Sequence, residues 1–124
     1  MKILDSSAMI AILRNDSVAR SILTYLNDER PAITAFTVYE IFQSIRLDDL
    51  QKTFQTLEEL PHLYFDTSTA VISSRLMSHL AKRGKKPGLV DLFIASICLR
   101  YQATLITLDK DFLEIPELSV KLIR

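Results

Sequence analysis

Short apolar segments alternate with longer helical segments along the chain, and this alternation constrains the fold more than any other feature of the sequence. The first apolar segment runs directly into Asp5 and two serines. Further segments with the character of strands lie at residues 32–35, 62–65, 103–107 and 118–123. Strands that alternate with helices are typical of a layered α/β fold with a parallel sheet. We therefore expect this architecture, with the first strand ending at Asp5.

The helices between these strands are predicted from apolar periodicity and from polar residues at their starts. Capping-box spacing places one helix start at Thr37, with Glu40 three residues later. Asp16 and Ser17, and the pair Asp48 and Asp49, are residue types that cap two other helices. After a first helix that follows Ser7, we expect helices over residues 18–29, 37–46, 50–60, 67–83 and 89–101.

The composition indicates a soluble globular protein with one domain. The chain has 124 residues, 48% of them hydrophobic and 24% charged, which is enough to build a core. Its formal net charge is zero, so binding to nucleic acid would depend on a local patch or a metal ion. The single cysteine fits a reducing compartment, and no apolar run is long enough to span a membrane. We therefore expect a cytoplasmic protein with no membrane partner.

Two carboxylates occupy positions that favour a binding or catalytic site, although each has an ordinary structural explanation. Asp5 ends a predicted parallel strand, where ligands bind in open α/β sheets, but an aspartate is also a preferred helix cap. Asp91 lies on the small-residue side of an apolar helix, where a buried carboxylate is costly unless it is paired or bound to a metal. As a first-turn acid, Asp91 could instead complement the helix dipole.

Two further acids could join them. Glu40 lies one turn into the helix after the second strand, where it could merely complete the capping box of Thr37. Asp109 follows the fourth strand, where it could merely satisfy the amides of a turn. Taken together, Asp5, Glu40, Asp91 and Asp109 can all reach the same carboxyl edge of a parallel sheet.

Acids gathered at one edge repel each other unless a divalent cation is present. His62 and His79 are not at ligand spacing, and Cys98 lies on an apolar helix where a thiol is usually inert. Ligands that are all oxygen atoms favour Mg²⁺ or Mn²⁺ over zinc. The sequence therefore predicts a site for one of these two ions.

The clearest loop is basic and contains Lys82, Arg83, Lys85 and Lys86, followed by Pro87 and Gly88. Such a cluster is usually a solvated loop. Next to an acidic metal site, it could instead hold a phosphate backbone.

Four segments in this order resemble the PIN-domain family, and in particular the VapC-like toxin ribonucleases of prokaryotic toxin–antitoxin pairs. They are Leu4-Asp5-Ser6-Ser7, Glu40 early in a helix, Val90-Asp91-Leu92-Phe93-Ile94-Ala95, and Leu105 to Phe112 around Asp109. The resemblance covers essentially the whole chain. It implies a single PIN-like domain over residues 1–124, a three-layer fold in which helices flank a parallel sheet of about five strands.

The resemblance also implies an activity, a site and partners. The activity would be metal-dependent endoribonuclease cleavage by the acidic quartet Asp5, Glu40, Asp91 and Asp109. Asp5, Asp91 and Asp109 would hold Mg²⁺ or Mn²⁺, and Glu40 would orient or deprotonate the attacking water. The hydroxyls of Ser7 and Thr107 would support the site, while Asp111 would be peripheral. Such toxins are typically homodimers that a cognate antitoxin blocks.

Two alternatives remain open from the sequence. A non-catalytic Mg²⁺-binding α/β module, such as a receiver-like domain, would need adjacent acids after its first strand, whereas Asp5 stands alone. A PIN nuclease that acts on DNA or in ribosomal RNA processing would share the same acids.

Overall fold

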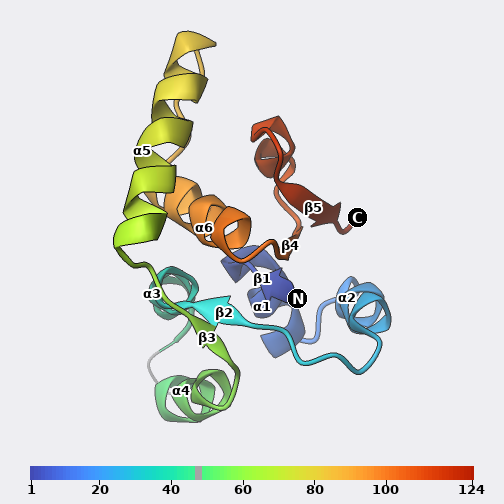
Figure 1. The fold of residues 1–124 in the computed structure, drawn as a ribbon. Helices are drawn as coiled ribbons and strands as arrows, with labels where there is room; N and C mark the ends of the chain where they lie inside the picture. The colour runs from blue at the N-terminus through green and yellow to red at the C-terminus, as the bar shows by residue number, and fades with distance from the viewer. Residues whose placement is uncertain (47–48) are drawn as a thin grey trace.

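The computed structural model describes residues 1–46 and 49–124, and all five predicted strands are present in it (Figure 1). They are β1 (Lys2–Leu4), β2 (Ile33–Thr34), β3 (His62–Leu63), β4 (Thr104–Thr107) and β5 (Ser119–Leu122). Strand β4 pairs in parallel with both β1 and β5, and β2 pairs in parallel with β3. The expected α/β fold with a parallel sheet is confirmed.

A single parallel bridge joins the three-stranded and the two-stranded sheet. It pairs Ile3 with Ala32, and the Leu4 N–H donates to the Ala32 carbonyl at 3.0 Å. The Ala32 N–H in turn donates to the Lys2 carbonyl at 2.8 Å. The strands therefore follow the order β3-β2-β1-β4-β5, in which the chain first winds to one side of β1 and later to the other. This reversal between β1 and β4 is the point where open α/β sheets bind ligands.

Helices cover both faces of the sheet. They are α1 (Ser6–Leu13), α2 (Ala19–Leu26), α3 (Ala35–Ser44), α4 (Leu50–Glu58), α5 (Thr67–Lys82) and α6 (Leu89–Arg100), with a 3₁₀ turn η2 (Lys110–Glu114) before β5. In Figure 1, α5 and α6 lie together at the upper left, above β1, β2 and β3, while α4 lies at the bottom and α2 at the right.

Successive strand residues point to opposite faces, and this period of two divides the core. Ile3 and Leu105 belong to one buried cluster, which also contains Leu80 of α5 and Ile97 of α6. Leu4 and Ile106 belong to another cluster, formed with the first four helices and Ile123. The three-layer arrangement follows, because each face of the sheet buries its own set of apolar side chains against helices.

Two helix starts differ from the predictions. Helix α3 begins at Ala35, and its cap is Thr34, whose hydroxyl accepts a hydrogen bond from the Thr37 N–H at 3.2 Å. The capping box of Thr37 with Glu40 is therefore wrong, because the strand ends directly in a capping threonine. Helix α2 has Val18 at its cap position with no side-chain hydrogen bond, so the predicted cap by Asp16 and Ser17 is also wrong.

The cap of α4 was predicted at Asp48 and Asp49. Asp48 lies outside the described residues, and Asp49 occupies the cap position without a side-chain hydrogen bond. The start of α5 at Thr67 is confirmed, with Asp66 as its cap. Within the described part of the chain, none of the helices has the length and apolarity needed to cross a membrane.

Candidate active site

Asp5 lies directly after β1, where it is both a helix cap and the buried centre of an acidic site. Only 4% of its surface is exposed. Its Oδ1 atom accepts hydrogen bonds from the Ala8 N–H at 2.9 Å and from the Ser7 hydroxyl at 2.7 Å. Its Oδ2 atom accepts a hydrogen bond from the Thr107 hydroxyl. The cap is therefore confirmed, and it uses one carboxylate oxygen while the other is directed toward β4.

Ser7 and Thr107 connect the end of β1 to the end of β4. The Ser7 hydroxyl accepts a hydrogen bond from the Leu108 N–H at 3.0 Å. The Thr107 hydroxyl accepts one from the Asp109 N–H at 2.9 Å. Each hydroxyl thus donates to Asp5 and accepts from the chain that follows β4, which fixes Asp5 relative to Asp109.

Glu40 is half-buried on α3 and is not used as a cap. Its Oε1 atom accepts a hydrogen bond from the Ser6 hydroxyl at 3.0 Å. Ser6 was not predicted as a site residue, yet it contacts one of the four acids. The signal available for it was its position between Asp5 and Ser7, at the first residue of α1.

Asp91 is half-buried in the first turn of α6. Burial raises the pKa of Asp91 to about 6, and the negative charges of Glu40, Asp109, Asp5 and Asp111 add to this increase. Burial is also the largest cause of the raised pKa of Asp5, with Glu40 acting in the same direction and three hydrogen bonds opposing it. The predicted quartet is therefore close enough in space for its charges to interact.

Asp109 is half-buried and begins the η2 turn. Its Oδ1 atom accepts a hydrogen bond from the Asp111 N–H at 2.9 Å, which is the turn contact that the sequence suggested. Asp109 nevertheless belongs to the acidic cluster, because its charge contributes to the raised pKa of Asp91. Asp111 is exposed at the edge of the cluster.

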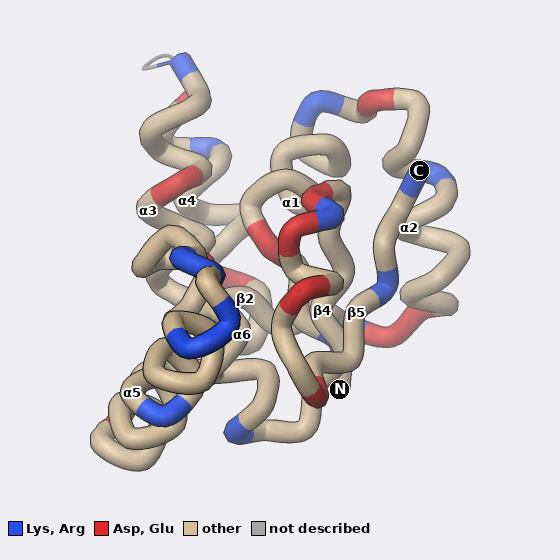
Figure 2. Tube along the Cα trace, turned by 90° about the horizontal axis from the view of Figure 1, so that it is seen from above, with Lys and Arg blue, Asp and Glu red and all other residues tan. Residues whose placement is uncertain are grey.

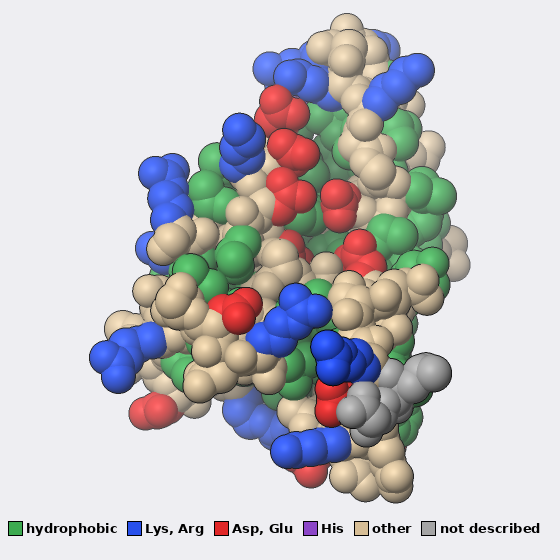
Figure 3. All heavy atoms as spheres, turned by 180° about the vertical axis from the view of Figure 1, so that it is seen from behind, with side chains coloured by type: hydrophobic (Ala, Val, Ile, Leu, Met, Phe, Trp, Pro, Cys, Tyr) green, Lys and Arg blue, Asp and Glu red, His purple; other side chains and the backbone are tan. Residues whose placement is uncertain are grey.

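The carboxylate oxygens of the acidic cluster are suitable ligands for a hard divalent cation, although the side chains do not converge on one point. Within residues 1–46 and 49–124, no three Asp, Glu, His or Cys side chains converge closely enough to hold one ion. Carboxylate oxygens gathered at one edge of a sheet are ligands that favour a divalent cation chemically. Asp5, Asp91 and Asp109 fit such an ion if their side chains turn toward each other. Figure 3 shows acidic side chains gathered in the upper half of the molecule, with Lys and Arg side chains around them.

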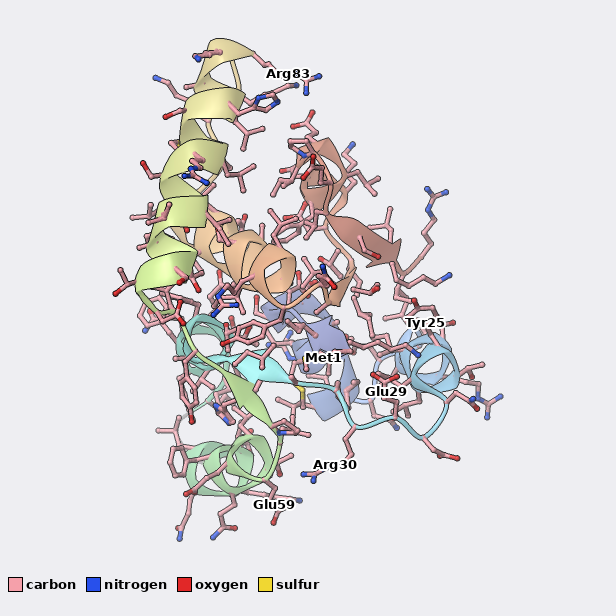
Figure 4. All side chains as sticks on the ribbon, in the orientation of Figure 1. Met1, Tyr25, Glu29, Arg30, Glu59 and Arg83 are labelled. Carbon is pink, nitrogen blue, oxygen red and sulfur yellow. The ribbon has the colours of Figure 1, made fainter. Side chains whose placement is uncertain are left out.

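The predicted basic cluster is divided between a helix end and a cavity. Lys82 ends α5, and Arg83 follows it at the tip of this helix (Figure 4). Lys85 and Lys86 line a cavity that Asp91 also lines. The Lys85 Nζ atom donates to Glu114 Oε1 at 3.0 Å, so this lysine is already in an ion pair. Figure 2 shows Lys and Arg positions near α5 and α6, and Asp and Glu positions closer to α1 and β4.

The cysteine and one histidine have structural surroundings. Cys98 is fully buried, and its burial raises the pKa of the thiol to about 12. It is therefore an inert core residue at neutral pH. The His62 Nε2 atom lies 2.9 Å from the Leu57 carbonyl.

The fold and the site together define a doubly wound α/β protein with a carboxylate cluster where its strand order reverses. Residues 2–118 match the PIN domain. The chain is 30% identical over 95 residues to ribonuclease VapC3 of Methanocaldococcus jannaschii, an alignment that covers 77% of this chain and 95% of that relative. The chain belongs to the PIN domain family, and the resemblance seen in its motifs is confirmed.

Solved structures agree with this assignment. A DNA-bound VapBC from Salmonella typhimurium is similar with a TM-score of 0.82 and 22% identity, over 97% of this chain and 96% of that one. VapBC-1 of nontypeable Haemophilus influenzae is similar with a TM-score of 0.79 and 25% identity, over 98% of this chain and 96% of that one. The PIN-like three-layer fold is therefore confirmed.

Proposed function

We propose that this protein is a Mg²⁺- or Mn²⁺-dependent endoribonuclease and the toxin of a toxin–antitoxin pair. The observation that carries the proposal is the buried Asp5 carboxylate at the end of β1, which the Ser7 and Thr107 hydroxyls link to the Asp109 segment after β4. Asp91 lies near enough to these acids that their charges add to its raised pKa. Acids gathered at one sheet edge repel each other, and a divalent cation would offset this repulsion. The relationship to a VapC ribonuclease supports RNA as the substrate.

The carboxylates have separate roles in this proposal. Asp5, Asp91 and Asp109 would hold the ion, directly or through water. When bound, the ion lowers the pKa of a water molecule and neutralises charge that builds on the phosphate. Glu40, held by the Ser6 hydroxyl, orients or deprotonates the water that attacks phosphorus. The hydrogen bonds from Ser7 and Thr107 hold the Asp5 carboxylate in position and would orient it toward a bound ion.

The partners follow from the same relationship. Solved relatives with similar folds are VapBC complexes, so we propose that a cognate antitoxin binds this chain and blocks its site. We also propose a cytoplasmic homodimer. Co-expression with the protein encoded by the adjacent reading frame should yield a stable complex that does not cleave RNA. Analytical ultracentrifugation of the free chain should give twice its 14.1 kDa mass.

A nuclease assay tests the activity and its alternatives. The purified protein is incubated with single-stranded RNA and with DNA of the same sequence, in Mn²⁺, in Mg²⁺ and in chelator. Cleavage of RNA alone, only with metal, supports the proposal. Cleavage of DNA would favour the DNA-directed alternative, and metal binding without cleavage would favour the non-catalytic module.

A further inference from the structure

A cavity of about 200 Å³ opens beside Asp91, between the loop that follows α5 and the η2 turn. Its floor is apolar and is formed by Leu80, Phe112 and Ile115, which are all buried. The cavity is smaller than the roughly 300–1,000 Å³ typical of pockets for drug-sized ligands. Its size and its floor therefore suit one flat heterocycle, such as a single nucleobase.

The rim of this cavity carries both hydrogen-bond donors and acceptors. Lys85 and Glu114 form a 3.0 Å ion pair that links the loop to the η2 turn. Lys86 is exposed and lines the cavity. Asp111 also lines it, and only the backbone N–H of Asp111 takes part in its hydrogen bond to Asp109. The Asp111 carboxylate is thus placed to accept hydrogen bonds, and the Lys86 ammonium to donate them.

We infer that this cavity binds the base of a nucleotide next to the cleaved phosphate and selects guanine. The inference relies on the proposed function for the class of substrate. Asp91 lines the cavity and belongs to the acidic cluster, so a base in the cavity would lie beside the phosphate held at that cluster. Sequence-specific recognition of RNA usually uses splayed bases in this way, with contacts to their pairing edges.

The charges at the rim favour guanine over the other bases. The pairing edge of guanine offers two adjacent N–H donors and one carbonyl acceptor. A carboxylate such as Asp111 can accept from both donors, and a lysine such as Lys86 can donate to the carbonyl. Adenine has a ring nitrogen acceptor where guanine has a donor, and uracil and cytosine lack the adjacent pair of donors.

The same charges oppose a free phosphate as the occupant. Asp91, Asp111 and Glu114 all line the cavity, and Lys85 is already paired with Glu114. An anion would therefore meet three carboxylates and a single unengaged lysine at this rim. A neutral base is the better match for this mixture of groups.

The experiment measures binding of the four 5′-mononucleotides in Mg²⁺ by ¹⁵N-edited NMR, with the wild type and three variants. We expect guanosine 5′-monophosphate to shift the amides of Gly88 and Phe112 and to bind at least about fivefold more tightly than the other three, the lower end of discrimination by a bidentate contact. Asp111→Asn should abolish this preference, and Lys86→Ala should weaken guanine binding. Glu117→Gln, an exposed acid that does not line the cavity, should behave as the wild type.

The possible failures are distinguishable. If all four nucleotides bind equally, if none shifts these amides, or if Asp111→Asn keeps the preference, the inference is wrong even if the protein cleaves RNA. If guanine binding behaves as expected but the protein cleaves no RNA, the proposed function fails and the base pocket stands. In an active protein, cleavage sites mapped on random single-stranded RNA should be enriched in a flanking guanine, and Asp111→Asn should reduce that enrichment.

Discussion

The Ser6 hydroxyl donates a 3.0 Å hydrogen bond to Glu40, which joins the first turn of α1 to the middle of α3. Ser6 directly follows Asp5, so one short segment fixes both the buried centre of the site and the acid proposed to handle the attacking water. This contact replaces the capping role that the sequence suggested for Glu40.

This relationship predicts a graded loss of activity. Glu40→Gln should lower the rate of RNA cleavage by roughly 100-fold or more, the usual contribution of a positioned general base. Ser6→Ala should lower it by less, because Glu40 remains but is no longer held. Ser6→Thr restores a hydroxyl and should recover most of the rate. Circular dichroism should first show that both proteins are folded. If Ser6→Ala then cleaves RNA at the same rate as the wild type, the Ser6 hydroxyl does not position Glu40.

The raised pKa of Asp91 predicts how stability changes with pH in chelator. Its folded-state pKa of about 6 lies above the reference value of 3.8, so the folded chain binds the proton more tightly. The stability that this proton provides is complete below pH 3.8 and is lost as the pH rises through about 6. Asp91→Asn should therefore reduce the fall in unfolding free energy between these two pH values.

Urea denaturation at several pH values measures this effect. Asp16→Asn is the matched control, because Asp16 is an exposed acid away from the cluster. Asp66 has a lowered pKa and therefore changes the free energy of unfolding with pH in the opposite direction. Its effect is the same in the wild type and in both variants, so it cancels in the comparison. If wild type and Asp91→Asn show the same pH dependence, the pKa of Asp91 is not raised in the folded chain.

Metal binding should raise the melting temperature. An ion that binds only the folded state, at a concentration ten times its Kd, adds about 1.4 kcal/mol to the free energy of unfolding. For a domain of this size, that corresponds to about 3–6 °C. Asp5→Asn should abolish this rise in melting temperature. The helix cap should remain, because the asparagine side chain still has an oxygen that can cap α1. Thermal melts of both proteins in chelator and in excess Mn²⁺ test this, and a wild type that ignores Mn²⁺ would argue against a metal site.

The basic residues at the end of α5 should contribute to RNA binding through charge. Replacing Lys82 and Arg83 by glutamine should reduce the slope of log affinity against log salt concentration by roughly 0.7 per lost phosphate contact. Lys85→Gln should change the slope less, because Lys85 already pairs with Glu114. The measurement is a salt titration of binding by an Asp5→Asn protein that leaves RNA intact. An unchanged slope in the double variant would mean that this end of α5 is only solvated.

Strand positions and the acidic cluster could be predicted from sequence because they depend on local patterns. Apolar segments that end in Asp5 or precede Asp109 identify strands and their carboxyl ends, and a parallel sheet brings those ends together. The short β2 and β3 are less regular than expected, since a single bridge at Ile3 and Ala32 connects them to β1.

The remaining features depend on contacts between segments far apart in the sequence. The start of α3 was misplaced because Thr34 and Thr37 both have capping chemistry, and only the end of the strand decides between them. The Lys85–Glu114 ion pair and the cavity beside Asp91 require the packing of η2 against the loop after α5. No spacing in the sequence indicates that these two segments meet.

The rates at which wild type and Asp91→Asn cleave RNA in Mn²⁺ show whether the acidic cluster acts as a catalytic metal site. Asparagine keeps the shape of the side chain but removes the charge that the proposed metal site requires. We expect the variant to lose at least about 100-fold in rate, the scale of losing one preorganised electrostatic group. The Asp16→Asn control should cleave as the wild type does. Asp91→Asn cleavage at the wild-type rate would contradict the account, because Asp91 would then act only on the dipole of its helix.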